Sequence, residues 1–387
     1  MTMDLRIEGG CGLIDGSLVE TSIDIASDPA GVITGIGNSY DAKHRIDARG
    51  LLVLPGIIDI HGDAFERQLM PRPGVGFPVE VALLDTDRQV VANGITTVFH
   101  GVTRSWEPGL RGDGSARAIL DAMERLRPRL AADTRYHLRH ETFNLDAEAE
   151  IVGWLAEKRI DILAFNDHMT STVESKDRAK KIGEMANRSG LPVEEFDRVV
   201  DRTRRRGNEV PASIARLAET ARANGIPILS HDDTSPDQRR WFRSLGSRVS
   251  EFPTTIETAE DAARGGDDIV LGAPNVVRGG SHTGWTKAAD MVERGLCSIL
   301  ASDYYYPAQL LAAFRLASDG IAPLERSWPL ISQAPATAAG LNDRGRIATG
   351  FRADLILVDA EHHPRVVATI AAGRIVHLTE GRRLLAN

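Results

Sequence analysis

Two potential metal ligands, His61 and Asp63, follow directly on an apolar run of the chain. The run extends from Leu51 to Ile60, and an apolar stretch of this length is typical of a β-strand that is covered on both faces. Because successive side chains of a strand alternate between its two faces, residues two apart point to the same side. A divalent ion at the end of this strand could therefore be held by both side chains.

Four further strand-like segments also end in His, Glu or Asp. Imidazole and carboxylate groups are ligands that zinc and similar divalent metals accept. A single such residue at a strand end is more often a capping, core or turn residue, but five such ends in one chain favour a metal centre. The four segments and their end residues are 136–141 with Glu141, 160–168 with His168, 226–233 with His231, and 297–303 with Asp303.

Strand-like and helical patterns alternate through the middle of the chain, as is typical of a parallel sheet with crossover helices. Three more strands are predicted at 94–100, 247–252 and 268–273. Helical patterns between the strands include 115–126, 146–158, 212–224, 258–265 and 287–294. Eight β-α units with functional groups at the carboxyl ends of the strands predict an α/β fold, a (β/α)₈ barrel of the TIM type.

The two ends of the chain do not continue this alternation. Both are rich in short strand-like segments joined by Gly and Asp turns. The most economical arrangement is one small β-sandwich domain built from both termini. The predicted domains are the sandwich, from residues 1–53 together with 345–387, and a hydrolase barrel over residues 54–344.

A charged segment at 174–211 is too long for a simple β-α loop, which usually has two to six residues. Its Lys, Arg and Glu residues fit two helices, at 174–189 and 192–205. Two interpretations stay open for this insertion. It is either a solvated helical surface, or a lid or partner surface above the site.

Composition and charge agree with a soluble cytoplasmic enzyme. The chain has 387 residues, of which 42% are hydrophobic and 26% charged, so it can bury a large core. No membrane span or signal peptide is expected, and two cysteines, Cys11 and Cys297, suit a reducing compartment. The net charge of −8 argues against binding of nucleic acid by bulk electrostatics. Self-association into a homo-oligomer stays open.

The chain resembles the amidohydrolase superfamily in its barrel, its terminal sandwich and the phrase GFRADL at 350–355. More narrowly, it is similar to the alpha-D-ribose 1-methylphosphonate 5-triphosphate diphosphatase family of phosphonate degradation. The resemblance covers nearly the whole chain. Five stretches carry it: HGDAFER at 61–67, PRPGV at 71–75, LDTD at 84–87, SHDD at 230–233 and RGGSH at 278–282.

The resemblance implies a metal shell of two divalent ions, zinc above all, with manganese or iron as alternatives. The superfamily usually has His-x-His after the first strand, whereas Asp63 stands at the second position here. Glu141 replaces the usual carboxylated lysine as the candidate bridging carboxylate, with His140 competing for that place. Asp232 likewise competes with its neighbour His231. The implied shell is His61, Asp63, Glu141, His168, His231 and Asp303.

The chemistry follows from this ligand set. A divalent ion lowers the pKa of bound water from about 15.7 to roughly 7, and Asp303 beside that water can accept its proton. A second ion could neutralise charge on the electrophile. The resemblance implies that the electrophile is the α-phosphorus of a ribose 5-triphosphate, and that the products are the 5-phosphate and pyrophosphate.

A highly anionic sugar phosphate needs local cations, because the chain as a whole is acidic. Arginine binds phosphate bidentately, and glycines let backbone N–H groups face phosphate oxygens. Phosphate sites of barrels also commonly lie in the loops after strands seven and eight. The predicted substrate-binding residues are Arg67, Arg72, Arg278, Gly279, Gly280, Ser281 and His282. A plain turn remains the alternative for the two glycines, and a rigid-loop cap the alternative for Arg72.

Two other functions compete with triphosphate hydrolysis. The first is hydrolysis of a C–N bond in a cyclic amide or an N-acyl group, for which the loop arginines would have no purpose. The second is a non-catalytic scaffold, and survival of the whole candidate shell argues against it.

Overall fold

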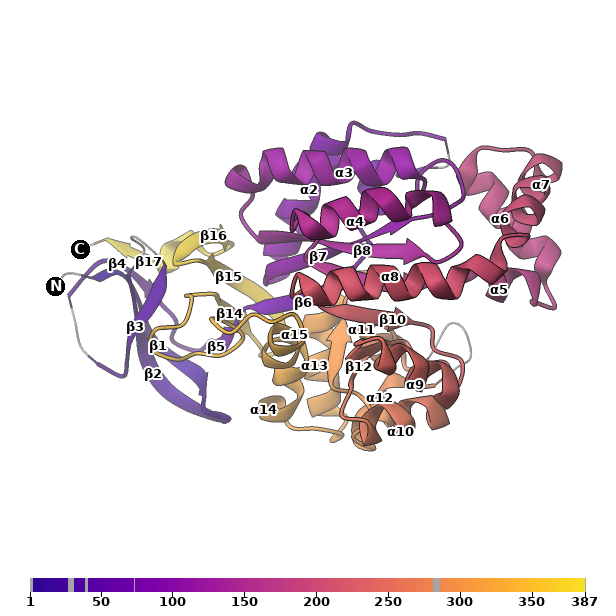
Figure 1. The fold of residues 1–387 in the computed structure, drawn as a ribbon. Coiled ribbons are helices and arrows are strands. Elements are labelled where there is room, and N and C mark those ends of the chain that lie inside the picture. The colour runs from indigo at the N-terminus through magenta and orange to yellow at the C-terminus, as the bar shows by residue number, and fades with distance from the viewer. Residues whose placement is uncertain (1–2, 27–30, 39–40, 73, 281–285, 387) are drawn as a thin grey trace.

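The computed structural model describes residues 3–26, 31–38, 41–72, 74–280 and 286–386. Eight parallel strands form one sheet in sequential order, and the helices that follow them cover its outer side (Figure 1). The predicted (β/α)₈ barrel is thus confirmed. Its strands are β6 (Ile57–Gly62), β7 (Ile95–Arg104), β8 (Asp133–Glu141), β9 (Ile162–Asn166), β10 (Ile228–His231), β11 (Val249–Glu251), β12 (Asp268–Gly272) and β13 (Ile299–Ala301).

The barrel closes between its first and last strands, just beyond β13. The Asp303 N–H donates to the His61 carbonyl at 2.9 Å, and the Asp63 N–H donates to the Asp303 carbonyl at 3.0 Å. Below this seam the barrel interior is filled by a buried apolar cluster that includes Ile60, Phe99 and Leu229. The polar groups therefore concentrate at the carboxyl end, as sequence patterns predict for this fold.

The outer layer consists of helices whose apolar faces pack on the strands. The helices predicted at 115–126, 146–158, 212–224, 258–265 and 287–294 all agree with the structure to within two residues at each end. The helices are α1 (Glu66–Leu69), α2 (Val79–Ala92), α3 (Asp113–Leu126), α4 (Glu148–Ala156), α5 (His168–Val173), α6 (Arg178–Ser189), α7 (Val193–Arg204), α8 (Val210–Ala223), α9 (Pro236–Ser244), α10 (Ile256–Arg264), α11 (Ala273–Arg278), α12 (Ala288–Glu293), α13 (Ala308–Ser318), α14 (Leu324–Ser327) and α15 (Gln333–Ala338).

Strands from both termini form a second sheet at one end of the molecule (Figure 1). Its strands form a single branched sheet with its own apolar core. The branch lies on β1, which pairs in parallel with β4 through its first half and with β5 through its second. The strands are β1 (Met3–Ile14), β2 (Ser17–Ala26), β3 (Val32–Ile36), β4 (Ala42–Asp47), β5 (Leu52–Pro55), β14 (Leu355–Asp359), β15 (Arg365–Ala371), β16 (Arg374–Leu378) and β17 (Leu384–Ala386).

Glycine makes this branch possible. The register of β1 against β2 shifts between Ile7 and Gly10, and Gly9 there has a φ of 70°. A Cβ on Gly10 would come within 2.5 Å of the Val53 side chain and 2.9 Å of the Ala48 Cβ. A larger residue would therefore push apart the two strands that share β1.

The charged insertion forms α6 and α7 at the end of the molecule opposite the terminal sheet (Figure 1). The first helix begins at Arg178, four residues later than the pattern predicts. Phe196 and other buried side chains of the insertion pack against Trp106 and Phe143 of the barrel loops. Arg188 also pairs with the buried Glu107 at 2.9 Å. These contacts hold the insertion against the barrel as a packed subdomain.

Candidate metal centre and active site

The seam that closes the barrel brings three of the predicted ligands together. His61 is the penultimate residue of β6, and Asp63 follows the strand on the same side of the chain, as the two-residue spacing predicts. The reciprocal backbone hydrogen bonds of Asp303 with His61 and Asp63 fix its side chain beside theirs. Donor atoms of His61, Asp63 and Asp303 all lie within 4.8 Å of one another.

Backbone strain accompanies this end of the barrel. Asp232 directly follows β10, Phe252 directly follows β11, and Asp303 comes two residues after β13. Their φ angles are 58°, 52° and 55°. The left-handed conformation costs an L-residue about 1–2 kcal/mol, and strain of this kind is typical of functional sites. It turns these residues toward the cavity instead of along their strands.

A buried carboxylate that the sequence analysis did not select links two predicted ligands. Glu251 ends β11 and has no exposed surface. Its two oxygens lie 2.9 Å from the His61 Nδ1 and 3.2 Å from the His231 Nδ1. A carboxylate that accepts from Nδ1 orients the ring and leaves the lone pair on Nε2.

Two of the candidate histidines, His61 and His231, are held in the neutral form that metal ligation requires. Burial, followed by the charge of Arg139, holds the pKa of His61 and of His231 well below the ordinary value. Burial and then the nearby Asp63 carboxylate raise the pKa of Asp303. A bound cation would relieve the crowding of these two carboxylates.

Three groups of donor atoms among the described residues fit a divalent ion. In each group the donors lie within 4.8 Å of one another and combine imidazole with carboxylate, which is the chemistry zinc and its neighbours accept. The groups are His61 with Asp63 and Asp303, His61 with His231 and Glu251, and His168 with His231 and Asp232.

Glu141, the predicted bridging carboxylate, is in none of these groups. One of its oxygens lies 2.5 Å from the His168 Nδ1, and the other accepts from the His168 N–H at 3.1 Å. Burial acts to raise the pKa of Glu141, but the facing His168 outweighs it and lowers that pKa to about 2. The structure therefore brings Glu141 to His168 rather than to the other ligands, and a bridging role stays a prediction.

Two residues, His140 and Asp232, compete with Glu141 and His231 for a place among the predicted metal ligands, and the structure places them differently. His140 is buried against Phe165, and neither ring nitrogen has a partner among the described residues. It lies on the side of β8 away from Glu141. Asp232 reaches the site, because one carboxylate oxygen lies 3.6 Å from the His231 Nε2.

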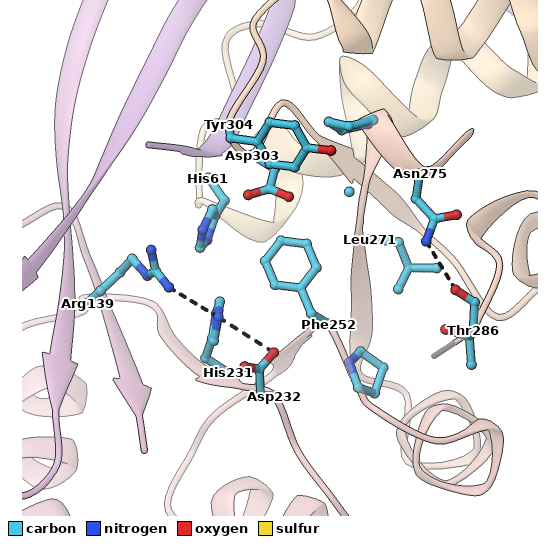
Figure 2. A pocket seen from close by; sticks show the side chains of 13 residues that line it. His61, Arg139, His231, Asp232, Phe252, Leu271, Asn275, Thr286, Asp303 and Tyr304 are labelled. Carbon is cyan, nitrogen blue, oxygen red and sulfur yellow. Dashed lines mark hydrogen bonds and ion pairs between the residues drawn. The ribbon is translucent and has the colours of Figure 1, made fainter. Parts of the chain in front are cut away.

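A cavity of about 200 Å³ opens between these residues and the loop after β12. Figure 2 shows His61, Asp303 and Tyr304 on one side, His231 and Asp232 below, and Asn275 and Thr286 on the far side. The ring of Phe252 lies between them and meets the rings of both His61 and His231 edge-on, at 5.0 and 5.1 Å.

Two predicted phosphate-binding arginines converge on the rim of this cavity. The Arg278 guanidinium lies 3.4 Å from the Tyr304 hydroxyl, and the Arg67 guanidinium lies 6.0 Å from the centre of the Tyr304 ring. Tyr304 follows directly on Asp303 and lines the cavity. Helices α1 and α11, which follow the first and seventh barrel strands, thus bring two cations to the tyrosine beside the predicted proton acceptor.

The predicted phosphate cradle of Gly279 and Gly280 backbone N–H groups does not form. Gly279 caps α11 with a φ of 77°, and its N–H donates to the Val276 carbonyl at 3.1 Å. The Gly280 N–H donates to the Asn275 carbonyl at 3.0 Å. Because both N–H groups close the helix, they are not available to a phosphate, and that donor role is wrong. The remaining residues of the motif, Ser281 and His282, lie outside the described residues.

Arg72 lies away from the cavity. It is exposed and lines a separate groove between the loop after β6 and helix α6, together with Arg67 and Arg188. Arg67 stands between this groove and Tyr304 at the cavity rim. A contribution of Arg72 to substrate binding therefore stays a prediction, and it would act through the groove.

Comparison with known proteins agrees with this architecture. A curated relative, the alpha-D-ribose 1-methylphosphonate 5-triphosphate diphosphatase of Escherichia coli K12, is 34% identical over 89% of this chain and 92% of its own. An adenine deaminase of Methylobacterium nodulans is 25% identical over 96% of this chain and 58% of its own. The crystal structure of Brevibacillus agri dihydropyrimidinase superposes with a TM-score of 0.67 at 13% identity, over 97% of this chain and 95% of that one.

The match to a family model is equally extensive. The amidohydrolase family model spans residues 52–376, from the last strand before the barrel into the final strands of the terminal sheet. No described helix is long and apolar enough to cross a membrane. The chain belongs to the amidohydrolase family.

Proposed function

We propose that this chain is a metal-dependent hydrolase of phosphonate catabolism that cleaves alpha-D-ribose 1-methylphosphonate 5-triphosphate to the 5-phosphate and pyrophosphate. The observation that carries the proposal is the pair of cations, Arg67 and Arg278, at the rim of a cavity that also holds Asp303. The similarity to the Escherichia coli diphosphatase supports the same substrate class. Free Cys11 and Cys297 suit a cytoplasmic location.

The residues of the cavity divide the chemistry between them. His61, Asp63 and Asp303 would hold a divalent ion, and the bound ion would supply acidified water and neutralise negative charge. Asp303 accepts the proton of the attacking water at its carboxylate, since it faces the cavity and is fixed by the barrel seam. The rim arginines bind the β- and γ-phosphates, so the pyrophosphate leaves from the side of Tyr304.

Replacing Arg278 with Ala is expected to lower kcat/KM for the triphosphate by roughly 10- to 150-fold. A charge-assisted hydrogen bond contributes about 1.5–3 kcal/mol, and each tenfold in rate corresponds to about 1.4 kcal/mol. Steady-state kinetics check the loss. Most of it appears in KM if Arg278 binds the pyrophosphate equally throughout, and in kcat if binding tightens in the transition state.

A matched control is Arg294→Ala, which removes an exposed arginine that pairs with Glu260 at 2.9 Å on the barrel surface. Normal kinetics are expected for this variant, since exposed ion pairs contribute little. If Arg278→Ala instead lowers the melting temperature and leaves the kinetics normal, Arg278 is a structural residue and does not belong to the site.

Hydrolysis of a C–N bond is the second candidate function. The similarity to adenine deaminase and the fold of dihydropyrimidinase favour it. Neither an adenine ring nor a dihydropyrimidine carries the charge of a triphosphate, so neither accounts for Arg67 and Arg278 beside Tyr304. These two arginines therefore favour a triphosphate substrate over a neutral ring substrate.

A substrate panel distinguishes the two functions. Purified protein is incubated with alpha-D-ribose 1-methylphosphonate 5-triphosphate, ATP, adenine and dihydrouracil, and pyrophosphate and ammonia are quantified together with ring opening. We expect pyrophosphate from the ribose triphosphate with a kcat/KM at least tenfold above that for ATP. Ammonia release or ring opening without pyrophosphate would contradict triphosphate hydrolysis and support C–N bond hydrolysis instead.

A further inference from the structure

A buried arginine lies inside the group of predicted metal ligands. Arg139 is on β8, and only 4% of its surface is exposed. One guanidinium nitrogen lies 3.3 Å from the Asp63 Oδ2. The other lies 3.2 Å from the His231 Nε2 (Figure 2). Arginine has five N–H donors, no acceptor, and stays protonated in proteins. The Nε2 of His231 must therefore accept the hydrogen bond.

This contact competes directly with a metal ion. An imidazole nitrogen has a single lone pair in the ring plane, and a hydrogen bond and a metal bond both use it. Zinc binds histidine nitrogen at about 2.0–2.1 Å, whereas the Arg139 Nη2 already lies 3.2 Å from that nitrogen. An ion and the guanidinium cannot both occupy this position. The group of His168, His231 and Asp232 is therefore closed to metal while Arg139 keeps its place.

The stem of Arg139 is confined by its surroundings. Gly101 on β7 faces it, and a Cβ on that glycine would lie 3.1 Å from the Arg139 Cδ. His137, Arg139 and Glu141 follow one another at intervals of two residues along β8. Their three side chains therefore lie on the same face of the strand and point into the barrel. His137 is itself fixed, because its Nδ1 lies 2.8 Å from the Ile60 carbonyl.

The seam group remains open to an ion. Arg139 contacts Asp63 through Oδ2 alone, which leaves Oδ1 for a metal. In the group of His61, His231 and Glu251, hydrogen bonds take the place of an ion, since the Nδ1 atoms of both histidines are at hydrogen-bond distance from Glu251. One ion site, formed by His61, Asp63 and Asp303, is thus compatible with every contact described at this centre.

We propose that Arg139 takes the place of a second ion. The chain then binds one divalent ion at the seam group, and the Arg139 guanidinium supplies the second positive charge beside it, where it faces the phosphoryl oxygens of the substrate. This inference rests on the proposed function and replaces the two ions expected from the sequence with one ion and one arginine.

The test is metal stoichiometry. Metal-free protein is reloaded with excess zinc, desalted and measured by elemental analysis, with binding isotherms from calorimetry. Wild type is expected to hold about one ion per chain, and Arg139→Met about two, because the lone pair of His231 and the second oxygen of Asp63 become free. Arg135→Met is the matched control: Arg135 is on the same strand, pairs with Asp133 and Asp161, and should leave one ion.

The outcomes are distinct. Two ions in the wild type, or one ion in both wild type and Arg139→Met, would overturn the inference and leave the proposed function intact. Active protein without any ion would overturn the proposed function itself. If Arg139→Met does not fold, manganese-loaded wild type decides: an isolated-ion electron paramagnetic resonance spectrum supports the inference, and an exchange-coupled pair contradicts it.

Discussion

Removal of a divalent metal is expected to lower kcat for the proposed triphosphate substrate by roughly 10³-fold or more. Metal ions contribute several kcal/mol of charge stabilisation in reactions of this kind, and each factor of ten corresponds to about 1.4 kcal/mol. Without the ion, the cavity confronts a polyanion with the carboxylates of Asp63, Asp232 and Asp303. Arg139 alone cannot offset them.

The measurement compares activity before and after chelation, with the metal content of each sample determined on the same day. Circular dichroism confirms that the chelated protein keeps its fold, and re-addition of zinc, manganese or iron identifies the ion that restores activity. Full activity in protein with less than about a tenth of an ion per chain would contradict metal dependence.

Replacing Asp303 with Asn is expected to lower kcat by about 10²- to 10⁴-fold while the fold stays intact. General base catalysis contributes a factor of that size, and an amide accepts protons poorly. Asn is also among the non-glycine residues best suited to the left-handed backbone at this position, where φ is 55°. The backbone seam with His61 and Asp63 should therefore survive the change.

A matched substitution separates chemistry from backbone strain. Asp15 has a φ of 45° in an exposed turn of the terminal sheet, far from the cavity. Asp15→Asn makes the same chemical change in a similar backbone conformation, and its kinetics should equal those of wild type. Turnover of Asp303→Asn within about threefold of wild type would show that Asp303 does not accept the proton.

The barrel and the His, Asp and Glu residues at its strand ends could be predicted from the sequence because the physical signals are local. An apolar run of several residues marks a doubly covered strand, and the two-residue period places His61 and Asp63 on one side. The same period, applied backwards from Glu141, would also have selected Arg139 and His137 on β8. Arginine carries no signal for a metal site because it is not a metal ligand, and the inference about Arg139 depends on that same property.

Glu251 was missed for a different reason. It ends a predicted strand, as His231 and Asp303 do, but its role depends on two histidines that are far away in the sequence. Contacts of this kind arise only when the barrel closes. The predicted roles of Gly279 and Gly280 failed because helix α11 has six residues, too few for a recognisable period, and so its cap could not be foreseen.

Isotope labelling tests the central claim most directly. The ribose triphosphate is hydrolysed in ¹⁸O-labelled water, and the products are analysed by mass spectrometry and phosphorus NMR. Attack at the α-phosphorus, with the pyrophosphate held by the rim arginines, predicts one ¹⁸O atom in the 5-phosphate and none in pyrophosphate. Label in the pyrophosphate, or release of inorganic phosphate in its place, would contradict the account.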